Sequence, residues 1–285
     1  MHEPPVGVDD ADVLAAVRRH WAPDADAVVH LPVGFGAHHW RASRDGAPLL
    51  FVTLDGFHRH DLDSLVATYA TAAALRDTGL GFVHAGLEPW AVPFGTGALS
   101  ATPWLDGERP VTLDVDATAA ALAALHAVEP PARLRSWRTL VGPELADDLD
   151  ARAVRPWDLG PLGEQARTAI TERLADIRRW VAAYHRLAEV ARDRPWVTTH
   201  GQPGVHNQVL TADGLRLVDW ESLLLAPPER DLRTVASGDP AMLELFALEW
   251  RLDEISLAAH RFAAPHTGTA DDHEAYAALL EELDA

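Results

Sequence analysis

Residues 196–231 constrain the fold of this chain more than any other segment. Two apolar runs, residues 196–199 and 215–220, are typical of short β-strands, and a polar loop separates them. Side chains that bind metals or carry protons gather in this loop and at the end of the second run: His200, Gln202, His206, Asn207, Asp219 and Glu221. We therefore expect a strand-loop-strand hairpin that carries a functional site.

Asn207 and Asp219 are the candidate metal ligands of this hairpin. Both offer oxygen atoms, which hard cations such as Mg²⁺ prefer. On adjacent strands they would hold an ion that bridges nucleotide phosphates. Taken singly, each residue has a simpler explanation, because Asn and Asp are common in turns and caps.

His200, Gln202 and His206 are the candidate catalytic residues. His200 either orders the loop by hydrogen bonding to backbone carbonyl groups or takes part in catalysis. His206 is a candidate base because imidazole titrates near neutral pH, although its side chain can equally point to solvent. The amide of Gln202 does not accept a proton, but its oxygen accepts a hydrogen bond from a hydroxyl group.

A second motif lies near the N-terminus, where Gly34, Phe35 and Gly36 separate two apolar runs. We expect a glycine turn between strands here, with a further strand over residues 49–54. Glycines allow the backbone to approach phosphates closely, so the turn is either a nucleotide-binding loop or a plain hairpin.

Helical periodicity dominates the rest of the chain. The spacing of apolar residues predicts helices over residues 13–21, 62–77, 115–126, 166–188 and 245–262, and a final acidic helix from Asp271. Prolines interrupt the pattern between residues 130 and 163, which we expect to be loops and short helices beside a substrate site.

Composition narrows the possible partners. The net charge of −19 argues against nucleic acid and favours cationic small molecules, with solubility as the simpler explanation. No cysteine is present, and all 24 basic residues are arginines, so no lysine-dependent mechanism operates from this chain. No apolar run approaches the length that spans a bilayer, and no signal peptide is recognisable at the start, so we expect a cytoplasmic protein without a membrane partner.

The pattern His-Gly-x-x-x-x-x-Asn, followed by an apolar run and Asp-Trp, resembles the aminoglycoside phosphotransferases, a kinase-like family. The segments LPVGFGAHHW, FVTLD and LVDWESLLLAPPERDL resemble its spectinomycin-phosphotransferase-like branch. The resemblance implies an α+β, bilobal protein-kinase-like fold, with a small β-rich N-terminal lobe and a larger helical C-terminal lobe. It places the nucleotide-binding lobe at residues 1–102, a connector at 103–110, and the helical lobe with the metal hairpin at 111–285.

The same resemblance implies roles for particular residues. Asn207 and Asp219 match the metal ligands for Mg²⁺, and Gly34 and Gly36 match the glycines of the loop that binds ATP or GTP. Residues 101–104, which include Ala101 and Trp104, resemble the segment whose backbone receives adenine. Two positions depart from the family, because Gln202 stands where an aspartate orients the substrate hydroxyl and Thr53 stands where kinases carry a lysine.

Three functions follow as hypotheses. The first is a Mg²⁺- and nucleotide-dependent phosphotransferase that acts on a hydroxyl group of a small cationic compound, such as an aminoglycoside. The second is a kinase-fold protein that binds a nucleotide or small molecule without phosphoryl transfer. The third is an enzyme that uses the same cleft for other chemistry, through His200, His206 and Glu221.

Overall fold

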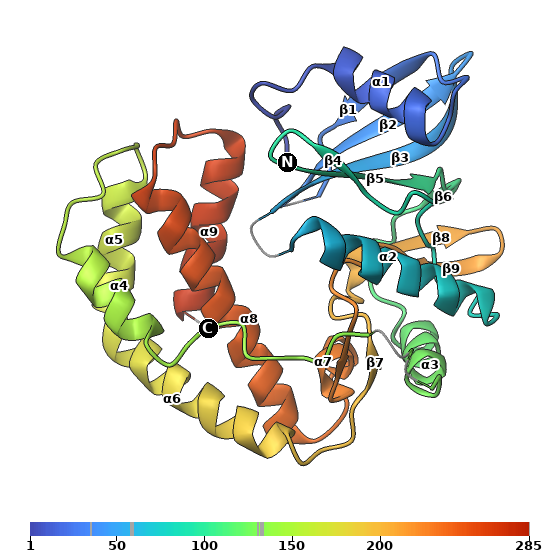
Figure 1. The fold of residues 1–285 in the computed structure, drawn as a ribbon. Coiled ribbons are helices and arrows are strands. Elements are labelled where there is room, and N and C mark those ends of the chain that lie inside the picture. The colour runs from blue at the N-terminus through green and yellow to red at the C-terminus, as the bar shows by residue number, and fades with distance from the viewer. Residues whose placement is uncertain (35, 58–59, 130, 132–133, 285) are drawn as a thin grey trace. The chain divides into compact units, whose positions relative to one another are not determined.

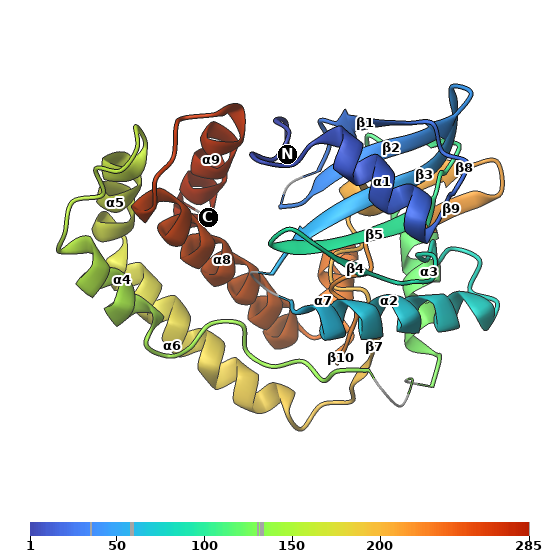
Figure 2. The same cartoon turned by 45° about the horizontal axis from the view of Figure 1, so that its top comes forward.

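The chain forms two compact units in the computed structural model, which describes residues 1–34, 36–57, 60–129, 131 and 134–284 (Figures 1 and 2). The first unit contains residues 1–136 and 197–235, and the second contains residues 137–196 and 236–285. The predicted lobe boundaries at residues 102 and 110 were defined by nucleotide-binding and substrate-binding roles. The two compact units do not test those roles, so these boundaries stay a prediction.

An antiparallel sheet of five strands forms the N-terminal part of the first unit, in the order β1-β2-β3-β5-β4. The strands are β1 (Ala27–Leu31), β2 (His38–Arg44), β3 (Ala47–Gly56), β4 (Val92–Phe94) and β5 (Gly97–Pro103). The predicted glycine turn lies between β1 and β2, where Gly34 and Gly36 both have positive φ angles. The strand expected over residues 49–54 lies within β3.

The two faces of this sheet differ in chemistry, because successive side chains of a strand point to opposite sides. On one face, Trp40 and Val52 are buried in a core with Val13 and Val17 of α1 (Asp10–His20). The other face carries Thr53 and the buried Asp55, and helix α2 (Leu62–Asp77) packs on it through an apolar cluster of Leu65, Ala91 and Ala98. The polar face is therefore the one available for a site.

The remainder of the first unit consists of short elements around the predicted hairpin. They are β6 (Gly107–Glu108), α3 (Val115–His126), β7 (Val197–Thr199), η1 (Val205–Asn207), β8 (Gln208–Thr211), β9 (Gly214–Leu217), β10 (Leu224–Ala226), α7 (Glu229–Leu232) and η2 (Arg233–Val235). Strands β6, β8 and β9 form one sheet, and β7 pairs with β10 in another.

This pairing corrects the predicted hairpin. The first predicted strand, β7, does not pair with β9, because the backbone turns away at Gly201, where φ is +98°. The hairpin is formed by β8 and β9 instead, with Gln208 opposite Leu217 and a tight turn that ends at Gly214. Asn207 therefore directly precedes the hairpin, and Asp219 lies two residues after it.

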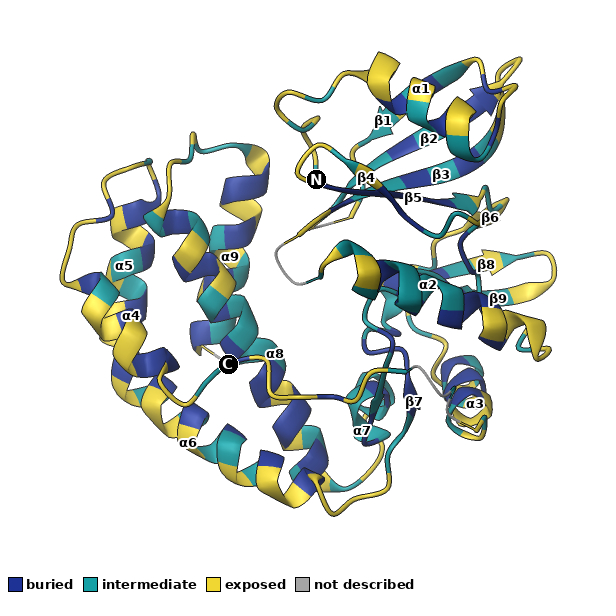
Figure 3. Ribbon diagram, viewed as in Figure 1, coloured by how far each residue is buried: buried dark blue, intermediate teal, exposed yellow. Residues whose placement is uncertain are grey.

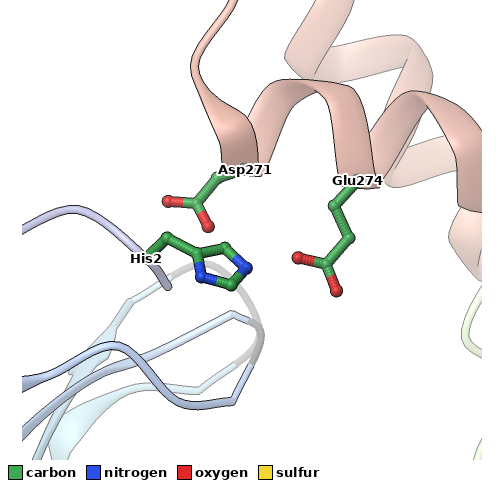
Figure 4. A group of neighbouring side chains, drawn as sticks. All are labelled: His2, Asp271 and Glu274. Atoms are coloured by element: carbon green, nitrogen blue, oxygen red, sulfur yellow. The ribbon is translucent and has the colours of Figure 1, made fainter.

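The second unit is helical. Its helices are α4 (Leu145–Ala153), α5 (Gly163–Glu172), α6 (Leu174–Ala191), α8 (Pro240–Ala263) and α9 (Ala270–Asp284), each with one buried face (Figure 3). The single helix expected over residues 166–188 is two helices, because Arg173 has φ −106° and ψ 7° and breaks the helical path. The acidic Asp271 and Glu274 project from the start of α9, as predicted for the last helix (Figure 4).

A buried network ties three elements of the second unit together. Glu249 of α8 accepts hydrogen bonds from Trp137 Nε1, at 3.0 and 2.8 Å, and from the Tyr184 hydroxyl of α6 at 2.6 Å. The Tyr184 oxygen accepts in turn from the backbone N–H of Leu140 at 3.0 Å. Across the described residues, no helix combines the length and apolar character that a membrane crossing requires.

Candidate functional site

Asp231 organises the start of the candidate catalytic loop. Its carboxylate accepts hydrogen bonds from the backbone N–H groups of His200, at 2.9 Å, and Gly201, at 2.6 Å. Nε2 of His126 lies 3.0 Å from the same carboxylate. Burial opposes the charged form of Asp231, but the hydrogen bond and charge of His126, followed by the charge of Arg230, lower its pKa overall. A buried carboxylate thus fixes the loop.

Both ring nitrogens of His200 are used inside the loop. Nδ1 accepts from the backbone N–H of Gln202 at 3.3 Å, so Nε2 carries the hydrogen and donates to the Val218 carbonyl at 3.0 Å. The ring is fully buried against Trp220, with centroids 4.4 Å apart. Burial lowers the pKa of His200 to about 4, which keeps the ring neutral. This geometry ties the loop to the segment that carries Asp219.

Gly201 is required by its backbone and by its neighbour. Its φ of +98° is strained for any residue with a Cβ atom, and the guanidinium group of Arg230 occupies the space where that atom would lie. Arg230 also donates to Thr199 Oγ1 at 3.0 Å. The His-Gly pair of the motif therefore reflects a tightly packed turn.

Asn207 and Asp219 are brought together by the β8–β9 hairpin. The backbone N–H of Val218 donates to the Asn207 carbonyl at 3.0 Å, which continues the pairing one residue beyond the strands. Nδ2 of Asn207 donates to the Gln202 carbonyl at 3.0 Å, so its Oδ1 is directed away from that bond. Asp219 has φ +66°, a left-handed backbone that is uncommon outside glycine and is found at functional sites.

Asp55 joins this group from β3. Its carboxylate is buried, and Oδ2 accepts a 3.0 Å hydrogen bond from the Tyr69 hydroxyl of α2. Burial, followed by the negative charge of Asp219, raises the pKa of Asp55 to about 7. Asp219 is exposed as a residue, but the surrounding protein desolvates its carboxyl group, and this burial raises its pKa to about 6. Both carboxyl groups thus have raised pKa values, and the charge of Asp219 contributes to that of Asp55. A divalent cation would stabilise the ionised forms of both.

Gln202 and His206 flank this donor set. The backbone of Gln202 bonds to His200 and Asn207, which fixes the start of its partly buried side chain. His206 is exposed at the surface, but burial of its ring among neighbouring groups, then Arg233 and Arg109, lowers its pKa. Its ring lies close to Gly204, where a Cβ atom would be 2.8 Å from His206 Cε1. His206 is thus a neutral imidazole beside Asn207.

The glycine turn and Thr53 meet at His39 on the polar face of the sheet. Thr53 pairs with His39 across β2 and β3, and its Oγ1 lies 3.1 Å from His39 Nδ1. A Cβ atom on Gly34 would lie 2.9 Å from His39 Nε2, so the ring sits directly against the turn. Burial, with nearby positive charges that include Arg109, lowers the pKa of His39 to about 3. At the position where kinases carry a lysine, this protein therefore has Thr53 beside a neutral His39, and neither side chain is charged.

An aromatic row continues from His39 along this face. The Phe51 ring lies 4.8 Å from His39 and 6.4 Å from Trp104, between centroids. The backbone groups of the predicted adenine segment are partly used within the protein, because the Ala101 carbonyl accepts from Leu87 N–H at 2.8 Å and Trp104 N–H donates to Leu49 at 2.9 Å. Phe35, predicted for the nucleotide loop, lies outside the described residues.

Sequence patterns did not reveal Asp55, Tyr69, His39 or His126 as parts of this site. Asp55 follows Thr53 by two residues, which places both on one face of β3, so strand alternation was a usable signal for it. No local signal links Asp55 to Asp219 or His126 to Asp231, because these contacts arise only when separate elements pack together.

Several known proteins resemble this chain in sequence or fold. Protein StrN of Streptomyces griseus is 39% identical over 98 residues, which cover 32% of this chain and 30% of that protein. The spectinomycin phosphotransferase APH(9)-Ia, in complex with ADP and spectinomycin, has a TM-score of 0.73 at 15% identity and covers 98% of both chains. The amicoumacin kinase hAmiN, in complex with AMP-PNP, Ca²⁺ and Ami, has a TM-score of 0.57 at 13% identity, over 97% of this chain and 93% of that one.

These likenesses establish a kinase-like α+β fold, with a β-sheet N-terminal region and a helical C-terminal part, as predicted. The sequence profile described as "Phosphotransferase enzyme family" matches residues 51–281, which include the β8–β9 hairpin and every candidate catalytic residue. The resemblance drawn from the motifs is thereby confirmed, and the chain belongs to the phosphotransferase enzyme family of aminoglycoside phosphotransferases and their relatives.

Proposed function

We propose that this protein is a Mg²⁺- and nucleotide-dependent phosphotransferase that phosphorylates a hydroxyl group of a small cationic compound. One observation carries the proposal: the β8–β9 hairpin brings Asn207 and Asp219 together, and the carboxylate of Asp55 lies close enough to Asp219 to raise its own pKa. Phosphoryl transfer depends chiefly on positioning and on neutralising phosphate charge, and this cluster provides an anionic donor set for that purpose.

The residues present fit a hard divalent cation. Asp219 offers a carboxylate, and Asn207 offers Oδ1 because its Nδ2 is engaged with Gln202. A bound Mg²⁺ would supply charge neutralisation for the nucleotide phosphates. Support comes from relatives of this fold, since the hAmiN complex contains AMP-PNP with Ca²⁺ and the APH(9)-Ia complex contains ADP.

The nucleotide would lie against the polar face of the five-stranded sheet. Gly34 and Gly36 would allow the backbone of the turn to approach the phosphates, and Phe51 with Trp104 offers an aromatic surface for the base. Either ATP or GTP fits these requirements. A cytoplasmic location would give the protein access to these nucleotides.

The side chains of the catalytic loop would divide the remaining tasks. The amide oxygen of Gln202 would accept a hydrogen bond from the acceptor hydroxyl and orient it. His206 would be the reserve base, because its lowered pKa leaves the ring neutral and able to accept a proton near neutral pH. His200 would act as a positioning residue, because both of its ring nitrogens are engaged within the loop. Because both ring nitrogens are engaged, the structure argues against the third hypothesis, in which His200 takes part in a reaction other than phosphoryl transfer.

The acceptor would be cationic because the chain carries a net charge of −19. The second unit also contains a cavity of about 230 Å³ between α4 and α8, and its lining includes the acidic Glu144, Asp148 and Asp253 beside Arg152 and His260. Spectinomycin is the compound bound in the APH(9)-Ia complex, so aminocyclitols and aminoglycosides are the first compounds to test. Antibiotic resistance would be the physiological consequence.

The test is product formation from the purified protein. Mg²⁺-ATP and Mg²⁺-GTP would each be incubated with a panel of aminoglycosides and aminocyclitols, and phosphorylated products would be sought by mass spectrometry. Asp219→Asn is the matched control, since asparagine tolerates the same left-handed backbone but lacks the charge. Product from the native protein, with a loss on the order of 10²-fold in the variant, supports the proposal. Absence of product with every acceptor contradicts it.

A second function is favoured by the catalytic loop itself. Gln202 cannot accept a proton, and loss of a general base costs roughly 10²- to 10⁴-fold in rate. Thr53 is paired with a neutral His39 where a lysine would bind phosphates. A protein that binds the nucleotide without transfer fits both observations, and calorimetry that detects Mg²⁺-nucleotide binding without any product would select it.

A further inference from the structure

Gln208 is a buried polar residue next to the proposed metal site. It is the first residue of β8, directly after Asn207, and only 1% of its surface is exposed. Its Nε2 donates to the Pro203 carbonyl at 2.9 Å and to Thr118 Oγ1 at 3.0 Å. Burying an amide costs free energy unless its polar atoms are hydrogen-bonded, so these two bonds account for a glutamine where a buried strand would otherwise favour an apolar side chain.

Two consecutive side-chain amides close the catalytic loop. Nδ2 of Asn207 donates to the Gln202 carbonyl at 3.0 Å, and Nε2 of Gln208 donates to the next carbonyl, that of Pro203. Pro203 has no N–H group, so its carbonyl is the only backbone group through which a hydrogen bond can hold this residue. The two bonds therefore fix the backbone that carries the Gln202 side chain.

Helix α3 anchors this loop at two points. Thr118, which is fully buried in the first half of the helix, accepts the hydrogen bond from Gln208. His126, about two turns further along, lies 3.0 Å from the Asp231 carboxylate, which holds the start of the loop. Gln208 thus supplies the second anchor, further along the loop.

We infer that Gln208 is a positioning residue: its amide fastens the Pro203 carbonyl to α3 and thereby sets the place of the neighbouring Gln202 side chain. The inference rests on the proposed phosphotransferase function, in which Gln202 orients the acceptor hydroxyl. Gln208 itself is buried, so it acts through the Pro203 carbonyl rather than by contact with a ligand. Because a misplacement of about 1 Å can reduce a rate 10²-fold, loss of this bond should slow transfer more than it weakens binding.

The experiment compares Gln208→Leu with the native protein. Leucine fills a similar volume but cannot donate a hydrogen bond. Single-turnover measurements would use saturating Mg²⁺-ATP, or Mg²⁺-GTP if that is the active nucleotide, with an acceptor that gives product in the panel. The rate constant for transfer should fall roughly 10- to 100-fold. The dissociation constant of the Mg²⁺-nucleotide should stay within about threefold of the native value, because Asn207 keeps its backbone bonds to Gly204 and Val218.

Thr118 provides a rescue test. Thr118→Val removes the hydroxyl group that anchors Gln208 to α3, whereas Thr118→Ser keeps a hydroxyl group at this position. Gln208 can still donate to Pro203 in Thr118→Val, so transfer should slow less than in Gln208→Leu, by roughly 3- to 10-fold. Thr118→Ser should recover most of that loss.

Asp114→Ala is the matched control for stability. Asp114 caps α3 by accepting a hydrogen bond from the Ala117 N–H at 3.0 Å, and this bond does not involve the loop. Loss of the cap should lower the melting temperature by about 2–4 °C without changing the rate constant for transfer.

Hydrogen exchange gives a readout that does not require activity. In peptides that cover residues 200–208, the backbone amides should exchange faster in Gln208→Leu than in the native protein, because the loop has lost an anchor. Asp114→Ala should exchange at the native rate in the same peptides, at a temperature where all the proteins are folded.

The outcomes separate this inference from the function on which it rests. If Gln208→Leu slows transfer at unchanged nucleotide affinity and Asp114→Ala does not, the inference is supported. If Gln208→Leu transfers at the native rate, or if Asp114→Ala slows transfer equally, the inference is overturned while the proposed function stands. If the native protein forms no product with any acceptor, the proposed function fails and hydrogen exchange decides the role of Gln208: faster exchange in Gln208→Leu supports it as the anchor of the loop, and unchanged exchange overturns it.

Discussion

The Tyr69 hydroxyl donates a 3.0 Å hydrogen bond to Oδ2 of Asp55. This bond crosses from α2 to β3 and is buried at the Asp55 end, since Asp55 is only 5% exposed, while Tyr69 is half-buried. Burial of the Tyr69 hydroxyl raises its pKa well above its ordinary value. It holds Asp55 in place although burial and the charge of Asp219 both disfavour ionisation of its carboxyl group. The tyrosine thus orients a carboxyl group at the edge of the proposed metal site.

Removal of this hydrogen bond should lower the free energy of unfolding by a measurable amount. Tyr69→Phe keeps the ring and leaves Asp55 without its donor, so the free energy of unfolding in urea should fall by about 1–2 kcal/mol. Tyr276→Phe is the control, because Tyr276 is likewise partly buried and contacts the Phe262 ring, but among the described residues its hydroxyl makes no hydrogen bond. Equal stability of Tyr69→Phe and the native protein would show that the bond does not contribute.

The buried network of the second unit gives an independent stability prediction. Glu249→Ala leaves Trp137 Nε1 and the Tyr184 hydroxyl without their shared acceptor and should destabilise that unit by about 3 kcal/mol. Glu249→Gln keeps one acceptor oxygen and should cost less. The exposed Glu244 lies on the same helix, so Glu244→Ala should change stability by less than about 0.5 kcal/mol. Tryptophan fluorescence during urea unfolding measures all three.

His200 predicts an acid-dependent loss of stability. Burial lowers its pKa from 6.5 in the unfolded chain to about 4 in the folded protein. Above pH 6.5 neither the folded nor the unfolded state binds this proton, so the contribution of His200 to the free energy of unfolding is fully present. As the pH falls from 6.5 to 4 the unfolded state binds a proton that the folded state excludes, and the free energy of unfolding decreases by roughly 3 kcal/mol.

The decisive quantity is the slope of stability against pH, because other histidines with lowered pKa values, such as His39 and His84, act in the same direction. His200→Gln removes one titrating group, so its stability should fall less steeply between pH 6.5 and 4 than that of the native protein. His206→Gln should keep most of the native slope, since His206 is exposed. Parallel curves for His200→Gln and the native protein would contradict the assignment.

Local patterns were sufficient for much of this fold. The glycine turn, α2 and α8 follow from apolar spacing and turn residues that act within a few positions of one another. The spacing of His200, Asn207 and Asp219 likewise pointed to the segment that carries the candidate metal ligands, because one short stretch contains all three, although the hairpin in it is formed by β8 and β9. The two glycines at positions 34 and 201 mark backbones that only glycine adopts without strain.

Contacts between distant segments were not available from such patterns. Strand β7 pairs with β10 rather than β9, and the apolar runs alone fit either partner. The helix break at Arg173 has no proline or glycine to announce it. Asp55 and Asp219 are 164 positions apart, so their mutual effect on pKa depends on tertiary packing alone. Sequence patterns were therefore sufficient to point to the segment of the candidate site, whereas the contacts that determine its chemistry were visible only in the structure.

Gln202 allows the sharpest test of how this site works. In the proposed function its amide orients the acceptor hydroxyl but cannot take its proton, so the transfer rate is limited by the absence of a strong base at this position. Gln202→Asp introduces a carboxylate on a backbone that is already fixed by His200 and Asn207. The rate constant for transfer should rise roughly 10²- to 10⁴-fold at neutral pH, with nucleotide affinity unchanged.

Gln202→Asn separates the effect of the base from that of side-chain length, because asparagine has the size of aspartate without its basicity. If proton acceptance is the missing step, Gln202→Asp should be fast and Gln202→Asn should be no faster than the native protein. Equal rates for the two variants would show instead that His206 or the acceptor's own environment removes the proton. Single-turnover measurements with saturating Mg²⁺-nucleotide distinguish these cases, because they report the chemical step without product release.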